Sequence, residues 1–229
     1  MKKTLLLLTF VLGVSHSAFG GACASETLDK YAALGVGGCT IGDLTFGNFQ
    51  YLSSTVAEGS ILVNPDTLTP GETGLDFNNF WGAAPGFSVD SAISFTVTCN
   101  DGCLIDDVVL VAGGAGGTTP GSIADASETS PALMGTSLSV GAAYGSPTVL
   151  MESDTTFMPV GSLTVTKDIG ASGGEINTGI GHGSQISDVS NLFSTTTQTS
   201  MTPEPPLLIL SAGLLGLVPI ARRKFLGHF

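Results

Sequence analysis

The chain has 229 residues, of which 42% are hydrophobic and 11% are charged. Its 19 acidic residues outnumber its 7 basic ones, and the segment 21–202 keeps 18 acidic but only 2 basic side chains. Nucleic acid is excluded as a partner, because affinity for phosphate backbones depends largely on Lys and Arg. Wholesale disorder is also excluded, since the apolar residues suffice for one domain with a core.

The first segment, 1–20, predicts a secretory signal peptide. Two lysines precede an apolar stretch from Leu5 to Val14, and small residues follow, which is the order found in such peptides. The apolar stretch is shorter than the ~20 residues that a membrane-spanning helix needs. We expect cleavage after Gly20. Cleavage after Ala22, which would leave Cys23 first for lipidation, is the alternative.

The body, 21–193, predicts one short helix and many strands. The helix is expected after Ser25 as its N-cap and before Gly35 as its stop. Apolar residues alternate with Ser and Thr from Ile93 to Thr98, which predicts a strand with one buried face. Asn100-Asp101-Gly102 then predicts a hairpin turn into a second strand, Leu104 to Ala112.

Further strands are expected along the whole body, separated by turns that contain Gly and Pro. They cover 43–52, 60–63, 75–80, 137–140, 148–151, 161–169 and 185–193. Strands of this number and length predict an all-β fold, an antiparallel β-sandwich of the jelly-roll type. A Ser/Thr-rich linker, 194–202, is expected to follow it.

Four cysteines in an exported chain predict two disulfides. Three pairings are possible, and proximity in the sequence favours Cys23 with Cys39 and Cys99 with Cys103. The second pair flanks the expected hairpin turn, where facing strand positions lie within bonding range. A zinc site is the alternative, although the first gap is wider than in most zinc motifs.

No catalytic motif is found in the body. Of the 3 His, only His182 lies between the two terminal signals, and no Gly-x-Ser-x-Gly elbow accompanies it. The glycine-rich stretch Gly113 to Gly121 lacks the Gly-Lys-Ser/Thr ending of a phosphate-binding loop. Carboxylates are so numerous that no single pair indicates a glycosidase. We therefore expect no enzyme activity and no cofactor.

Two groups of residues are candidates for ligand binding. Asp101, Asp106 and Asp107 are the densest carboxylate cluster and could hold calcium, which prefers oxygen ligands; a solvated acidic surface is the simpler interpretation. Trp81, beside Phe80 and two asparagines, could form a platform on which a sugar ring stacks. A core position is favoured for this lone tryptophan.

The C-terminal segment, 203–229, has three elements in a fixed order. Pro203-Glu204-Pro205 forms a rigid acidic motif, an apolar run follows from Leu207 to Ala221, and Arg222-Arg223-Lys224 closes it. The apolar run, as a helix, would rise only about 22 Å, so the bilayer must thin or flanking groups must snorkel. The basic cluster predicts that this end stays cytoplasmic while the body lies outside the inner membrane.

This tail resembles the PEP-CTERM sorting signal of exported proteins of Gram-negative bacteria. The resemblance covers about an eighth of the chain and rests on the Pro203-Glu204-Pro205 motif, the transmembrane helix 207–221 and the basic cluster. It implies the secretion machinery and the membrane protease exosortase as partners, and exopolysaccharide by association. A plain C-terminal anchor is the alternative, because Pro206-Leu207 replaces the small polar residues that commonly follow the motif.

We expect an exported protein that is held in the inner membrane as a precursor and then reaches the cell surface or the extracellular matrix. Its expected role is structural or adhesive. The alternative is a carbohydrate-binding module or a polysaccharide-acting hydrolase, which predicts an aromatic groove beside two carboxylates.

Overall fold

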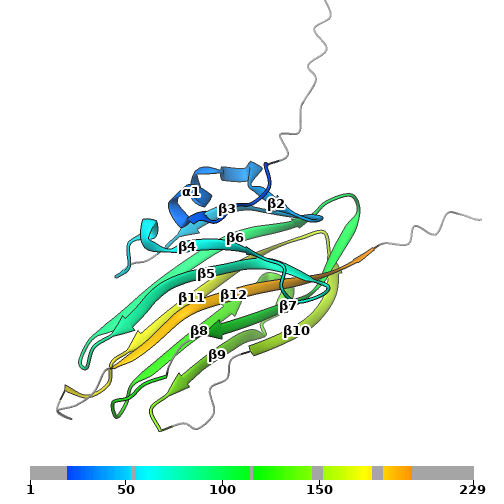
Figure 1. Ribbon diagram of the computed structural model, residues 1–229. Helices are drawn as coiled ribbons and strands as arrows, with labels where there is room; N and C mark the ends of the chain where they lie inside the picture. The colour runs from blue at the N-terminus through cyan, green and yellow to red at the C-terminus, as the bar shows by residue number, and fades with distance from the viewer. Residues whose placement is uncertain (1–19, 53–54, 114–115, 146–151, 177–182, 198–229) are drawn as a thin grey trace, which may run out of the picture. The chain divides into compact units, whose positions relative to one another are not determined.

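The computed structural model describes residues 20–52, 55–113, 116–145, 152–176 and 183–197 (Figure 1). They form two six-stranded antiparallel sheets that pack as a sandwich. We name each sheet after its long central strand. The β12 sheet contains, in spatial order, β1 (Glu26–Thr27), β4 (Leu62–Asp66), β5 (Glu72–Ala83), β12 (Ser184–Thr197), β7 (Cys103–Gly113) and β10 (Glu152–Val160). The β11 sheet contains β2 (Cys39–Ile41), β3 (Leu44–Tyr51), β6 (Ser88–Cys99), β11 (Ser162–Ser172), β8 (Ile123–Thr129) and β9 (Ser137–Ala143).

The last eight strands pair as if one long hairpin had been folded over on itself. The antiparallel pairs are nested, and they are β5 with β12, β6 with β11, β7 with β10, and β8 with β9. Such nested pairing across two sheets is typical of a jelly roll. The prediction of an all-β antiparallel sandwich is confirmed.

The hairpin predicted for 93–112 is wrong. Its two strands exist as β6 and β7, but they belong to different sheets, and the turn Asn100-Asp101-Gly102 carries the chain from one sheet to the other. Asp101 and Gly102 both have positive φ, which allows this tight reversal. Alternation predicts that each strand buries one face. It does not distinguish a neighbour in the same sheet from a partner across the core.

The core forms because alternate side chains of both sheets point inward. In β6 the buried side chains are every second one from Ser91 to Cys99, as the alternation predicts. Aromatic rings from the two sheets meet in this interior: Phe77 lies 5.7 Å from Phe95, and Phe46 lies 6.0 Å from Phe193, between ring centroids. The tilted arrangement of these rings is favourable for aromatic pairs.

The helix α1 (Leu28–Ala33) packs at the edge of the sandwich near β3. Its N-cap position is Thr27 and not Ser25, and no side chain caps it. The predicted stop is confirmed, since the helix ends before Gly35, whose φ is 60°. Leu28 and Tyr31 are its buried residues, and the Tyr31 hydroxyl donates a hydrogen bond to the Ala24 carbonyl at 2.7 Å. In the described part of the chain, short 3-10 turns include η1 (Gly35–Gly37), η2 (Glu58–Ser60) and η3 (Pro131–Leu133).

The observed strands differ from the expected ones in one boundary and in number. Strand β12 includes Ser194–Thr197, which we expected in the linker, because these residues pair with β7. Strands β1, β2, β8 and β10 were not expected at all, and the expected strand 148–151 lies outside the described residues. Among the residues that the structure describes, no helix is long and apolar enough to cross a membrane; the predicted span 207–221 falls outside them.

Candidate functional site

The three aspartates proposed for calcium are not gathered into a site. Asp101 is exposed in the turn between the sheets, whereas Asp107 lies on β7, where Ser194 donates to one of its carboxylate oxygens. Asp106 is half-buried on the same strand. Within the described ranges there is no group of three or more His, Cys, Asp or Glu side chains that could hold a metal ion.

Trp81 belongs to the core, which confirms the favoured interpretation, and the alternative of a sugar-stacking platform is wrong. Its side chain is fully buried, and its indole N–H donates to the Ser91 hydroxyl at 3.1 Å. The exposed aromatic of this segment is Phe80, with 67% of its surface accessible. Trp81 is in phase with the inward-facing Leu75 and Phe77 of β5, so alternation places Trp81 in the core and leaves Phe80 exposed.

Beside Phe80, the outer face of the β12 sheet carries a network of carboxylate, amide and hydroxyl groups. Asp76 accepts hydrogen bonds from the Asn78 amide and from the Ser190 hydroxyl, the latter at 3.1 Å. Burial raises the pKa of Asp76, and the two hydrogen bonds act against that shift because they favour the ionised form. The network can accept and donate hydrogen bonds to a polar ligand that lies across β5 and β12.

The same face carries mutually repelling carboxylates at its far edge. The pKa of Glu72 is raised by partial burial and by the nearby carboxylates of Asp107, Glu152 and Asp154. Partial burial likewise raises the pKa of Asp107. This part of the surface is therefore strongly acidic.

A second acidic cluster lies on the outer face of the β11 sheet. Asp90 on β6 and Asp125 on β8 both pair in register with Gly170 on β11, and Asp168 follows the same face of β11. Gly170 has no side chain, so the three carboxylates approach one another. Burial, a hydrogen bond with Asp90 and the charges of Asp90 and Asp125 raise the pKa of Asp168 to about 6.

A cavity of about 150 Å³ opens beside α1. It is lined by the segment that follows the predicted signal-peptide cleavage site, by residues of α1 and by Gly38 and Cys39. Lys30 and Glu26 are its charged lining residues, and the buried Tyr31 has its pKa raised to about 12, mainly by burial.

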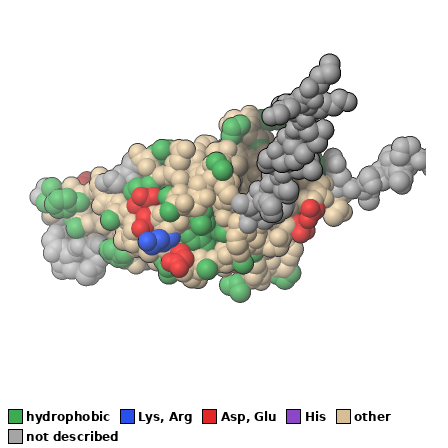
Figure 2. Space-filling view, turned by 90° about the horizontal axis from the view of Figure 1, so that it is seen from above, with side chains coloured by type: hydrophobic (Ala, Val, Ile, Leu, Met, Phe, Trp, Pro, Cys, Tyr) green, Lys and Arg blue, Asp and Glu red, His purple; other side chains and the backbone are tan. Residues whose placement is uncertain are grey.

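Figure 2 shows a face of the molecule on which a single basic patch lies among acidic side chains.

Both predicted disulfides are present. Cys23 is bonded to Cys39, and Cys99 to Cys103, with Cα–Cα distances of 4.8 and 5.4 Å. The second bond closes the turn between the two sheets and not a hairpin. No cysteine is free, so the zinc alternative is wrong. Lipidation of Cys23 is wrong as well, because its sulfur is used by the disulfide.

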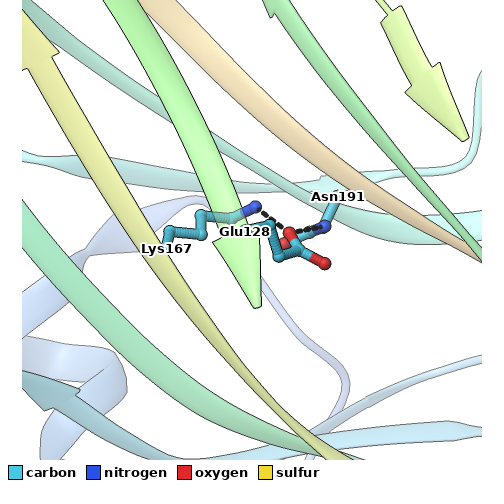
Figure 3. Close-up of polar contacts among 3 residues, drawn as sticks. All are labelled: Glu128, Lys167 and Asn191. Carbon is cyan, nitrogen blue, oxygen red and sulfur yellow. Dashed lines mark hydrogen bonds and ion pairs between the residues drawn. The ribbon is translucent and has the colours of Figure 1, made fainter. Parts of the chain in front are cut away.

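A buried polar cluster that was not predicted from the sequence lies between the sheets, formed by Glu128, Lys167 and Asn191 (Figure 3). All three side chains are fully buried. The alternation of β11 contained a signal for it, because Lys167 is in phase with the inward-facing Val165 and Ile169. Its partners come from β8 and β12, which are remote in the sequence.

The other predicted positions lie outside the described residues. These are His182, the motif Pro203-Glu204-Pro205 and the basic cluster Arg222-Arg223-Lys224. The sorting signal therefore stays a prediction from the sequence.

Comparison with known proteins gives few matches. No family model matches the chain, and no curated protein matches it. Among solved structures, the carbohydrate-binding module TmCBM61, determined in complex with β-1,4-galactotriose, aligns with a TM-score of 0.30 and 12% sequence identity. The alignment covers 66% of this chain and 88% of that one.

Proposed function

We propose that this chain is an exported protein of the cell surface or extracellular matrix, with a structural or adhesive role, and that its C-terminal signal is sorted and processed by exosortase. The two disulfides support export, because such bonds persist in oxidising compartments. The acidic outer faces support a role in contact with water and with polar partners.

The observation that carries the proposal is the position of β12. This strand ends at Thr197, just before the sorting motif, and it is hydrogen-bonded along its length to β5 on one side and to β7 on the other. A tail attached here pulls on a central strand. Tension on the anchor must therefore break hydrogen bonds to two neighbours, which suits a domain that is held by its C-terminus.

Intact-mass analysis of the exported form tests the sorting step. The wild-type chain is expressed in a Gram-negative host that has exosortase, beside a variant in which Pro203, Glu204 and Pro205 are changed to Ala. We expect the wild-type mass to lack the apolar tail and the variant to keep it in the inner membrane. A wild-type protein that retains 207–221 identifies a plain anchor and contradicts the proposal.

A deletion strain tests the structural role. If the matrix of this strain lacks the protein but keeps its cohesion, the structural role is contradicted.

A second candidate, carbohydrate binding, is favoured by Phe80. An exposed ring beside the Asp76 and Asn78 side chains combines a stacking surface with hydrogen-bonding groups, as sugar-binding surfaces require. Glycan-array binding by the purified body tests it. Phe80→Ala is expected to abolish binding, whereas Phe87→Ala, which removes another exposed ring, is the matched control. Equal binding by both variants and by the wild type contradicts this site.

A further inference from the structure

Lys167 is a buried cation whose environment is unusual for a structural ion pair. Its Nζ atom lies 2.8 Å from Glu128 Oε2, and both side chains have no accessible surface. The Asn191 side-chain amide donates to that same oxygen. Lys167 and Glu128 face each other on neighbouring strands of the β11 sheet, while Asn191 reaches them from the β12 sheet (Figure 3). The amine and the amide therefore meet on one carboxylate oxygen.

The surroundings of this cluster are apolar. The Phe77 ring centroid lies 5.7 Å from Lys167 Nζ, and Asn191 lies on β12 two residues before the buried ring of Phe193. Burial lowers the pKa of Lys167, and the charge of Glu128 only partly offsets this effect. A lysine in such a site loses its proton more readily and then presents a nucleophilic amine.

The cluster is also incompletely satisfied as a set of hydrogen bonds. Glu128 Oε1 and Asn191 Oδ1 are both buried and have no partner. Each unpaired buried oxygen is unfavourable, because it has lost its hydrogen bonds to water and gained none within the protein. In addition, a buried ion pair usually stabilises a protein no more than apolar side chains of the same volume would. Stability alone therefore does not account for these three residues at the centre of the sandwich.

We propose that Lys167 and Asn191 react with each other to form an intramolecular isopeptide bond, with Glu128 as the catalytic acid and base. The Lys167 amine attacks the Asn191 side-chain carbonyl carbon. A bond forms between lysine Nζ and asparagine Cγ, the bond from Cγ to Nδ2 breaks, and Nδ2 leaves as ammonia. One amide replaces another, so no oxidant, reductant or activating group is needed.

Glu128 touches both reacting side chains and so can move the protons. It first takes a proton from the Lys167 ammonium, which leaves a neutral amine and a neutral carboxyl group. The protonated carboxyl group of Glu128 can then donate a hydrogen bond to the unpaired carbonyl oxygen of Asn191. This hydrogen bond makes the Asn191 carbonyl carbon more electrophilic. As the intermediate collapses, the second proton lost by lysine Nζ passes through Glu128 to the departing nitrogen, which leaves as ammonia. The proton first taken from the ammonium stays on Glu128, so the product has a neutral carboxyl group beside a neutral amide and no charge to bury.

The bond would join the two sheets covalently near their centres. β11 and β12 are the central strands of their sheets, and β12 is the strand that leads to the tail. This inference stands independently of how the tail is sorted. It adds to the domain a cross-link that neither reduction nor unfolding can open.

Mass spectrometry of the purified, reduced and denatured protein tests the bond. Formation removes one ammonia, so the expected mass is about 17 Da below that calculated from the sequence. Trypsin gives a second readout, because Lys30 and Lys167 are the only cleavage sites within 21–202 and an acylated lysine is not cut. We expect cleavage at Lys30 but not at Lys167. A peptide pair joined through Lys167 and Asn191 should be found after digestion with chymotrypsin.

Three variants serve as controls. Glu128→Gln and Asn191→Ala keep Lys167 in its sequence context, and both are expected to keep the full mass and to be cut at residue 167. Lys167→Met distinguishes the bond from a succinimide, which an asparagine forms with the same loss of ammonia: the full mass supports the isopeptide, whereas the reduced mass overturns it. A wild-type protein of full mass that is cut at Lys167 also overturns the proposal. That measurement needs no variant to fold.

Discussion

Trp81 Nε1 donates a hydrogen bond to Ser91 Oγ across the interior of the sandwich, over 3.1 Å. Trp81 belongs to β5 and Ser91 to β6, so the bond joins the two sheets. The Ser91 hydroxyl is also 2.9 Å from the Tyr51 hydroxyl, which in turn donates to the Val56 carbonyl. One small buried serine therefore satisfies the polar atom of the largest core side chain.

Ser91→Ala is expected to destabilise the protein, because it leaves the Trp81 indole N–H buried without an acceptor. The expected loss in free energy of unfolding is about 1–3 kcal/mol. Urea denaturation, followed by tryptophan fluorescence, measures it. Ser94→Ala is the control on the same strand, since Ser94 points to the outer face and its hydroxyl only accepts a bond from Thr166. Equal stability of the two variants would contradict the role assigned to Ser91.

The two disulfides are expected to contribute unequally to stability. The bond Cys23–Cys39 spans 16 residues and Cys99–Cys103 spans 4. The chain-entropy model gives about 3 kcal/mol for the first and about 2 kcal/mol for the second. Replacing each pair with Ala and comparing the urea midpoints checks the order. A larger loss from the Cys99–Cys103 pair would show that this bond acts on the folded connection between the sheets and not only on the unfolded chain.

The raised pKa of Asp168 predicts that the stability of the protein depends on pH. Its pKa is raised from 3.8 to about 6 by burial and by Asp90 and Asp125, so the folded protein binds this proton more tightly than the unfolded chain does. The resulting stabilisation is fully present below a pH of about 4 and is lost as the pH rises through about 6. The melting temperature of the wild type should fall across this window.

Asp168→Asn should reduce that fall and raise the melting temperature at neutral pH, because it removes one of the repelling charges. Calorimetric melts between pH 4 and 7 measure both effects. Asp43→Asn, at an exposed carboxylate outside the cluster, is the control. A wild-type melting temperature that rises with pH over this range, or identical profiles for the two variants, would count against the cluster.

The sequence predicted those features that depend on local patterns. Alternation located the long strands, and the proximity of cysteines predicted both disulfides. β8 was missed because its inward positions, Ala124 and Ala126, are small and give little hydrophobic contrast. Sheet membership also could not be predicted: the strands on either side of Asn100-Asp101-Gly102 each have one apolar face, and that pattern fits a hairpin as well as two facing sheets.

The buried cluster required information that no local pattern contains. Alternation alone places Lys167 on the inward face of β11. Its neighbour Glu128 follows from the pairing of β11 with β8, and Asn191 from the way in which the sheets pack. Trp81 is the opposite case, since it is in phase with the buried Leu75 and Phe77 of β5, and alternation alone separates it from the exposed Phe80.

Gly38 and Gly42 offer a matched test of how the N-terminal segment is held. Both have φ of 56°, a conformation that costs a residue with a Cβ about 1–2 kcal/mol. A Cβ on Gly42 meets open space, whereas one on Gly38 would lie 2.1 Å from the carbonyl oxygen of Phe46. Gly38→Ala must therefore also displace β3 or the segment before Cys39. Gly38 and Cys39 line the cavity beside α1. We expect Gly42→Ala to lower the free energy of unfolding by the conformational cost alone and Gly38→Ala to lower it by clearly more, both measured by urea denaturation. Equal losses would mean that the contact between Gly38 and Phe46 is loose, and that residues 21–24 are held by the disulfide Cys23–Cys39 and not by this packing.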